Sequence, residues 1–233
     1  MTHLDTEIQQ LKIDTLDMWA LVQNQLSKCK EALTNFDSDL SRDVVATEKR
    51  VNAYELKLDR DCENIIALFN PVAIDLRFVL SVLKINSNLE RIGDVAESIS
   101  KFVIKTGIDF DKELLKTSDI LKMFETAEAL FADVSLAFEN EDTRLARKVF
   151  KKDEILKQAN DTSAMAVTEY IKQHPDQIEQ SLHVLSIIRK LDRVGDLSKS
   201  IAEEIIFYVE AKVLKHIPKK EKIKILSKDD PKS

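Results

Sequence analysis

Leu89-Glu90-Arg91-Ile92-Gly93-Asp94 is one of two short blocks that decide how this chain is organised. The second block, Leu191-Asp192-Arg193-Val194-Gly195-Asp196, repeats its order of aliphatic, acidic, basic and glycine positions. Two of the chain's 3 glycines stand in these blocks, although a glycine inside a helix costs about 1 kcal/mol relative to alanine. Two such positions in matched surroundings indicate an internal duplication and a local packing demand.

The composition is typical of long amphipathic helices. Hydrophobic residues make up 44% of the 233 residues and charged residues 33%, whereas aromatic residues reach only 6%. With only 3 glycines and 4 prolines, strands and tight turns are disfavoured, and we expect an all-α fold. The net charge of −6 argues against nucleic acid as a partner, because binding to phosphates requires a concentrated positive surface.

Proline and glycine positions divide the chain into two sets of three helices. Asn70-Pro71 and His174-Pro175 each end one helix and precede another, and the stretch 106–109 is the natural seam between the sets. We predict helices over about 5–36, 40–69, 72–105, 113–139, 142–173 and 176–214. The predicted domains are two similar three-helix bundles side by side, 1–108 and 109–216, followed by a charged, disordered tail over 217–233.

The acidic residues of the two blocks lie on one face of their helices. At about 100° per residue, Glu90 and Asp94 fall opposite the apolar stripe of the third helix, and Asp192 and Asp196 fall opposite that of the sixth. We therefore expect all four to face solvent. Paired charges on such a face are often only solvated. Their repetition after the same glycine favours a binding site.

A second set of oxygen donors flanks the apolar stripe of the second helix. Glu48, Asn52 and Glu55 would approach the first acidic block if helices two and three pack antiparallel. The matching positions of the fifth helix are Asp153, Lys157 and Asn160, so the second copy is poorer in carboxylates. Oxygen ligands without nearby His or Cys favour hard or borderline cations. The candidate metal ligands are Glu48, Asn52, Glu55, Glu90, Asp94, Asp153, Asp192 and Asp196.

These motifs resemble those of the PhoU family of phosphate-signalling proteins from about Asp14 to His216. The two blocks are similar to the family's repeated acidic motif, residues 70–77 to its Pro-x-x-x-Asp-Leu-Arg turn, and residues 200–203 to its Asn-Ile-Ala-Glu segment. The resemblance implies tandem three-helix bundles with metal clusters held by the acidic motifs. The metal would be a divalent or trivalent ion, Fe, Mn, Mg, Ca or Zn.

The resemblance also implies a regulatory role. Family members act as negative regulators that link a phosphate ABC transporter, through its ATPase subunit, to a sensor histidine kinase. We expect a homodimer that reaches the membrane only through these partners. The chain departs from the family pattern at Asn52, Lys157 and Lys101, which stand where acidic residues would complete the motifs. The second metal site is the more affected.

The sequence is also compatible with two other functions. A metal-free helical adaptor could use the same acidic faces to bind a basic partner. A carboxylate di-iron or ferritin-like enzyme would need Glu-x-x-His pairs facing a bundle core, and the sequence contains none. We therefore predict that the protein is not an enzyme. The first residues lack the basic and apolar regions of a signal peptide, which favours a cytoplasmic protein.

Overall fold

The computed structural model describes residues 2–107, 109–214 and 217 of the chain, and these residues contain helices and no strands. Most of the predicted tail therefore lies outside the described residues. The helices are α1 (His3–Asn35), α2 (Ser38–Phe69), α3 (Ala73–Thr106), α4 (Lys112–Thr117), α5 (Ile120–Glu139), α6 (Thr143–Gln173), the 3₁₀ helix η1 (Pro175–Gln177) and α7 (Ile178–Glu210).

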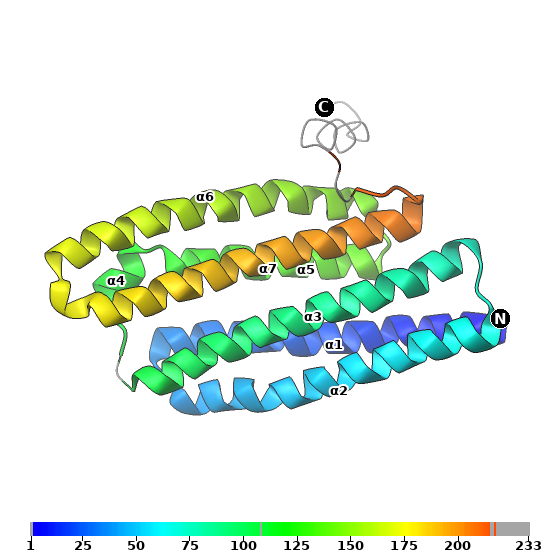
Figure 1. The fold of residues 1–233 in the computed structure, drawn as a ribbon, viewed down its shortest axis with the longest axis horizontal. Helices are drawn as coiled ribbons and strands as arrows, with labels where there is room; N and C mark the ends of the chain where they lie inside the picture. The colour runs from blue at the N-terminus through cyan, green and yellow to red at the C-terminus, as the bar shows by residue number, and fades with distance from the viewer. Residues whose placement is uncertain (1, 108, 215–216, 218–233) are drawn as a thin grey trace.

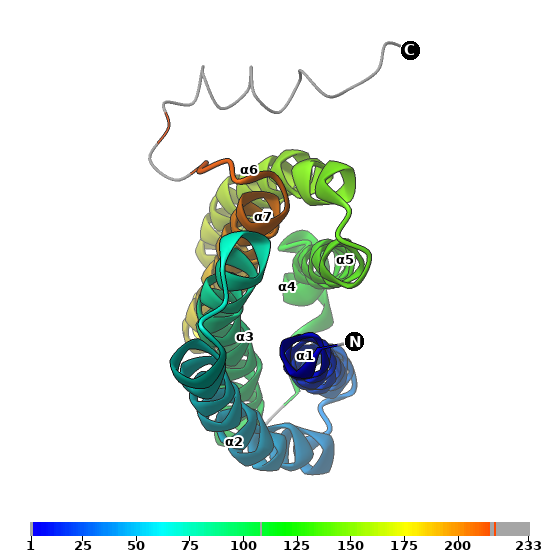
Figure 2. The same ribbon diagram turned by 90° about the vertical axis from the view of Figure 1, so that its right-hand side faces the viewer.

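Two three-helix bundles lie side by side, as the duplication predicts. Helices α1, α2 and α3 form one bundle, and α5, α6 and α7 form the other (Figure 1). Seen along the helices, α2, α3, α7 and α6 form one curved layer (Figure 2). Helices α1 and α5 lie next to each other on the concave side of this layer. Because α3 packs against α7, the two helices that carry the acidic blocks are neighbours.

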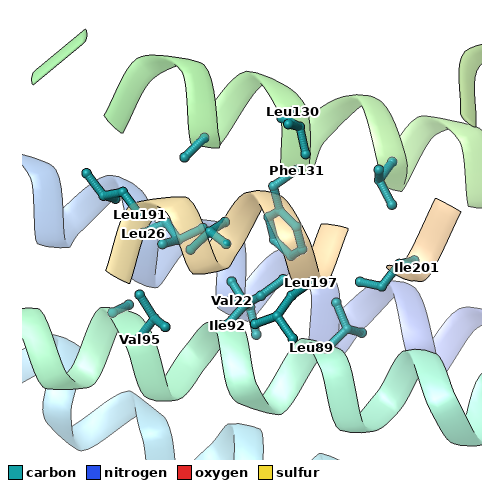
Figure 3. Close-up of a cluster of buried hydrophobic side chains, with 14 of the residues drawn as sticks. Val22, Leu26, Leu89, Ile92, Val95, Leu130, Phe131, Leu191, Leu197 and Ile201 are labelled. Atoms are coloured by element: carbon teal, nitrogen blue, oxygen red, sulfur yellow. The ribbon is translucent and has the colours of Figure 1, made fainter. Parts of the chain in front are cut away.

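The hydrophobic core is continuous across both bundles. Figure 3 shows side chains of α1 and α3 meeting those of α5 and α7. The indole ring of Trp19 in α1 stacks on Phe131 of α5, with ring centroids 5.3 Å apart. Arg77 adds a polar link, since its Nε donates to the carbonyl oxygen of Tyr208 at 3.2 Å. The bundles thus share buried surface, and their division at residue 108 stays a prediction.

The same capping chemistry begins the second helix of each bundle. The Asp37 carboxylate accepts hydrogen bonds from the backbone N–H groups of Asp39 and Leu40, at 2.9 and 2.8 Å. Asp142 accepts from Arg144 and Leu145 at 2.8 and 3.0 Å. These bonds satisfy amide groups that have no partner within the helix. The helices begin at Ser38 and Thr143, within two residues of the predicted starts at 40 and 142.

The predicted helix over 113–139 is wrong in one respect, because the structure breaks it at Ser118 and Asp119. Asp119 adopts the left-handed backbone conformation, with φ 51°. This break turns α4 away from the line of α5, so that Leu114 and Leu115 are buried against α6 while Ile120 begins a separate core-facing stripe. The last helix also ends at Glu210 rather than at 214.

Among the described residues, every helix lacks an apolar stretch of the length needed to span a bilayer.

Candidate metal site

The first acidic block lies where α3 approaches α2, and Gly93 makes that approach possible. A Cβ atom at Gly93 would lie 2.9 Å from Glu48 Oε2, 3.2 Å from Gln25 Oε1 and 3.3 Å from Val51 Cγ1. All three distances are shorter than ordinary van der Waals contact. The glycine therefore leaves room for a carboxylate of α2 to lie directly over the backbone of α3.

Three carboxylates converge above this contact. One oxygen of each of Glu48, Glu90 and Asp94 lies within 4.8 Å of the others. Glu48 is buried, Glu90 is partly buried and Asp94 is exposed, so the group runs from the helix interface to the surface. The antiparallel packing of α2 and α3 predicts this convergence.

The two oxygens of Glu48 have different surroundings. Oε2 accepts a hydrogen bond of 2.9 Å from Nε2 of Gln25 in α1. Oε1 is buried without a hydrogen-bond partner, although Glu48 is only 3% exposed. An unpaired buried carboxylate oxygen is unfavourable. A cation bound by the three carboxylates would give this oxygen a partner.

Burial and mutual repulsion make these carboxyl groups hard to ionise. Burial, together with the charges of Asp94, Glu55 and Glu48, raises the pKa of Glu90 to about 7. Burial also raises the pKa of Glu48, where the Gln25 hydrogen bond opposes the shift and Asp94 adds to it. A cation bound here would stabilise the ionised forms.

The residues present fit a hard divalent cation. Glu48, Glu90 and Asp94 would supply charged oxygen ligands, and the exposed side leaves room for water to complete a coordination shell. Glu55 lies outside this group but close enough for the charge of Asp94 to contribute to its raised pKa, after burial and Asp59. Asn52 is exposed and also lies outside the group.

The second bundle repeats the glycine contact with a different outcome. A Cβ atom at Gly195 would lie 2.8 Å from Leu156 Cδ2 and 3.0 Å from Asp153 Oδ1. Asp153 of α6 thus lies over α7 as Glu48 lies over α3. It is 2% exposed, and its Oδ1 has no hydrogen-bond partner.

Two ammonium groups lie among the second set of carboxylates. Lys157 Nζ is 2.9 Å from Asp153 Oδ2 and 3.0 Å from Asp196 Oδ1. Lys199 Nζ is 2.8 and 3.0 Å from the same two oxygens. Burial acts to raise the pKa of Asp196, but hydrogen bonds from both lysines lower it overall.

Asp192 lies beside this arrangement and has no lysine bound to it. Its Oδ2 accepts a hydrogen bond of 3.2 Å from Nδ2 of Asn160, and its Oδ1 is buried without a partner. Burial and the charge of Asp196 raise its pKa, while Lys157 opposes the shift. The structure thus brings the predicted ligands Asp153, Asp192 and Asp196 together. The ammonium groups of Lys157 and Lys199 lie between Asp153 and Asp196.

The expectation that all four block carboxylates face solvent is correct for Asp94 and only partly correct for the other three. Glu90, Asp192 and Asp196 are partly buried, because a second helix covers the edge of each acidic face. Sequence reasoning also missed Gln25, which carries no signal in the repeats. It missed Lys199 as well, although its place three residues after Asp196 indicates an ion pair on one helix face.

Comparison with known proteins agrees with this architecture. The PhoU domain model matches twice, at residues 15–103 and 120–205. The accessory protein PhoU of Edwardsiella tarda is 32% identical over 92% of this chain and 88% of its own length. That of Escherichia coli K12 is 30% identical over 98% and 94%.

Solved structures give the same result. PhoU from Pseudomonas aeruginosa superposes with a TM-score of 0.84 at 26% identity, over 90% of this chain and 100% of that chain. The phosphate transport system regulatory protein PhoU from Streptococcus pneumoniae superposes at 0.79 and 26% identity, over 91% and 99%. With two matched domains, relatives along almost its whole length and the same fold, the chain belongs to the PhoU family.

Proposed function

We propose that this protein is a metal-binding regulator of phosphate transport and of the response to phosphate starvation. Its relatives are phosphate-specific transport system accessory proteins, and one structural neighbour is a phosphate transport system regulatory protein. The chain covers those relatives almost completely, which supports the same role for the whole protein. The role is regulatory rather than catalytic.

The observation that carries the metal-binding part is the unpaired Oε1 of buried Glu48 beside Glu90 and Asp94. A cation would give that oxygen a ligand and neutralise three carboxylates that repel one another. Glu48 and the acidic block come from different helices, so a shared cation would also join α2 to α3. In this way metal occupancy would stiffen the surface that a partner meets.

The proposed partners are the ATPase subunit of a phosphate ABC transporter and a sensor histidine kinase. We propose that the protein acts as a homodimer in the cytoplasm and represses phosphate uptake when phosphate is plentiful. The acidic group of Glu48, Glu90 and Asp94 reaches the surface at Asp94, which is exposed. Such a surface suits a basic protein face.

A gene deletion with complementation tests this function. Deletion should derepress phosphate-starvation genes in phosphate-rich medium, and the wild-type gene should restore repression. A gene carrying Glu48→Gln, Glu90→Gln and Asp94→Asn together should restore repression poorly at equal protein level. Unchanged expression in the deletion strain would contradict the regulatory role. Full repression by the triple variant would instead favour a metal-free adaptor.

A further inference from the structure

We infer that the second repeat's acidic site is closed to metal, because the ammonium groups of Lys157 and Lys199 take the place of the cation. The contrast between the repeats rests on the proposed metal binding by the first. The closure of the second site rests on its own ion pairs. Each chain would thus have one repeat that responds to metal and one whose helix contact is fixed.

The ion pairs show how the lysines replace a metal ion. Both ammonium groups contact Oδ2 of Asp153 and Oδ1 of Asp196, with all four distances between 2.8 and 3.0 Å. Lys157 comes from α6 and Lys199 from α7, so each helix supplies a cation to a carboxylate of the other. These pairs hold α6 to α7 as a bound cation would hold α2 to α3.

In each repeat, one oxygen of the buried carboxylate lies close to the glycine. The other oxygen has different partners in the two repeats. In the first repeat Oε2 of Glu48 is the oxygen close to Gly93, and the other oxygen, Oε1, has no partner. In the second, Oδ1 of Asp153 is close to Gly195, and the other oxygen, Oδ2, accepts from both lysines. The same position is available in one repeat and taken in the other.

The residues that match the two lysines explain why the first repeat stays open. Aligning the glycine contacts places Asn52 opposite Lys157 and Glu97 opposite Lys199. Asn52 is neutral and exposed, and Glu97 pairs with Lys101 at 2.6 Å. A metal ion entering the second site would have to displace two ammonium groups from a carboxylate that is 2% exposed.

Mn²⁺ titration of the full-length, chelator-stripped protein is the first test. Glu90→Gln with Asp94→Asn should abolish Mn²⁺ binding, because the second repeat contributes none. Binding that survives this change and is then lost with Asp192→Asn and Asp196→Asn would overturn the inference. If the wild-type protein binds no Mn²⁺ at all, the proposed metal-binding function is wrong. The variant Lys157→Asn with Lys199→Glu then decides the inference alone.

Exchanging the matched residues is that second test. Lys157→Asn with Lys199→Glu gives the second repeat the residues of the first. This variant should bind one more Mn²⁺ ion per chain than the wild-type protein, because the second repeat gains a site. It should also melt earlier than wild type in EDTA and recover with Mn²⁺. The matched control, Lys148→Asn with Lys151→Glu, changes the charge equally at exposed lysines of α6 and should do neither.

No gain of Mn²⁺ binding by the exchange variant would overturn the inference. If that variant does not fold, the reverse exchange decides. Asn52→Lys with Glu97→Lys places two ammonium groups in the first repeat, where they should raise the melting temperature in EDTA and abolish Mn²⁺ binding. Unchanged Mn²⁺ binding by a folded reverse variant would show that lysines at these positions do not close the site.

Discussion

Gly93→Ala tests the packing on which the first site depends. Alanine is favoured over glycine inside a helix by about 1 kcal/mol, so the change should stabilise the protein if only helix propensity mattered. The new methyl group, however, would lie 2.9 Å from Glu48 Oε2 and 3.3 Å from Val51 Cγ1. Overpacking of a buried contact costs about 1–3 kcal/mol.

Glu48 cannot move away without a further loss. Its Oε2 is held by Gln25, and displacement breaks a buried hydrogen bond worth about 1 kcal/mol. The net expected effect of Gly93→Ala is a destabilisation of about 1–2 kcal/mol. For a chain of this size that lowers the melting temperature by roughly 2–8 °C.

Differential scanning calorimetry of the metal-free protein measures this effect. Ser87→Ala and Ser87→Gly, at a partly exposed position of the same helix, give the intrinsic difference between alanine and glycine. Gly93→Ala should show the opposite sign to that difference. A Gly93→Ala protein that melts higher than wild type would refute the claim that this glycine is required by the contact with α2.

Arg147 donates hydrogen bonds of 2.8 and 2.7 Å to the Glu210 carboxylate and lowers its pKa from 4.5 to about 2. The pair therefore stabilises the fold above pH 4.5, and this stability is lost as the pH falls towards 2. Glu210→Gln should therefore cost about 2–3 kcal/mol at pH 7 and much less at pH 2, measured by denaturant unfolding. Trp19→Ala should lower the free energy of unfolding by about 3–5 kcal/mol. Because the ring stacks on Phe131 of the other bundle, both bundles should melt earlier together, and a calorimetric trace in which only one bundle shifts would argue against a shared core. Mn²⁺ at a hundred times its dissociation constant should stabilise the wild-type protein by about 2.7 kcal/mol, and EDTA should remove the whole gain.

Most of the fold could be predicted because its signals are local. The helix starts at Asp37 and Asp142 and the stops before Pro71 and Pro175 depend on capping and backbone chemistry that a short stretch of sequence carries. The break at Ser118 and Asp119 could not be predicted in this way. It contains no glycine or proline and reflects which neighbours the two segments meet in the folded chain.

The candidate site was predictable to the level of its acidic residues. The repeated block identified Glu90 and Asp94 in the first repeat and Asp192 and Asp196 in the second as candidate ligands. The antiparallel pairing of α2 and α3 then predicted that Glu48 lies near Glu90 and Asp94. Periodicity of a single helix could not show that Glu90 is partly covered, because the covering helix is distant in the sequence. For the same reason nothing in the sequence pointed to Gln25, which lies in α1 and donates a hydrogen bond to Glu48.

Anomalous scattering from a Mn²⁺-containing crystal of the full-length protein would show which of the two acidic sites holds metal. An anomalous difference peak should lie between the carboxylates of Glu48, Glu90 and Asp94. No peak should lie beside Asp153 and Asp196, where the two lysines should remain. A peak beside Asp153 and Asp196 would show that the second site is open to metal. No peak at the first site, in a crystal grown with saturating Mn²⁺, would show that the first site does not bind this ion.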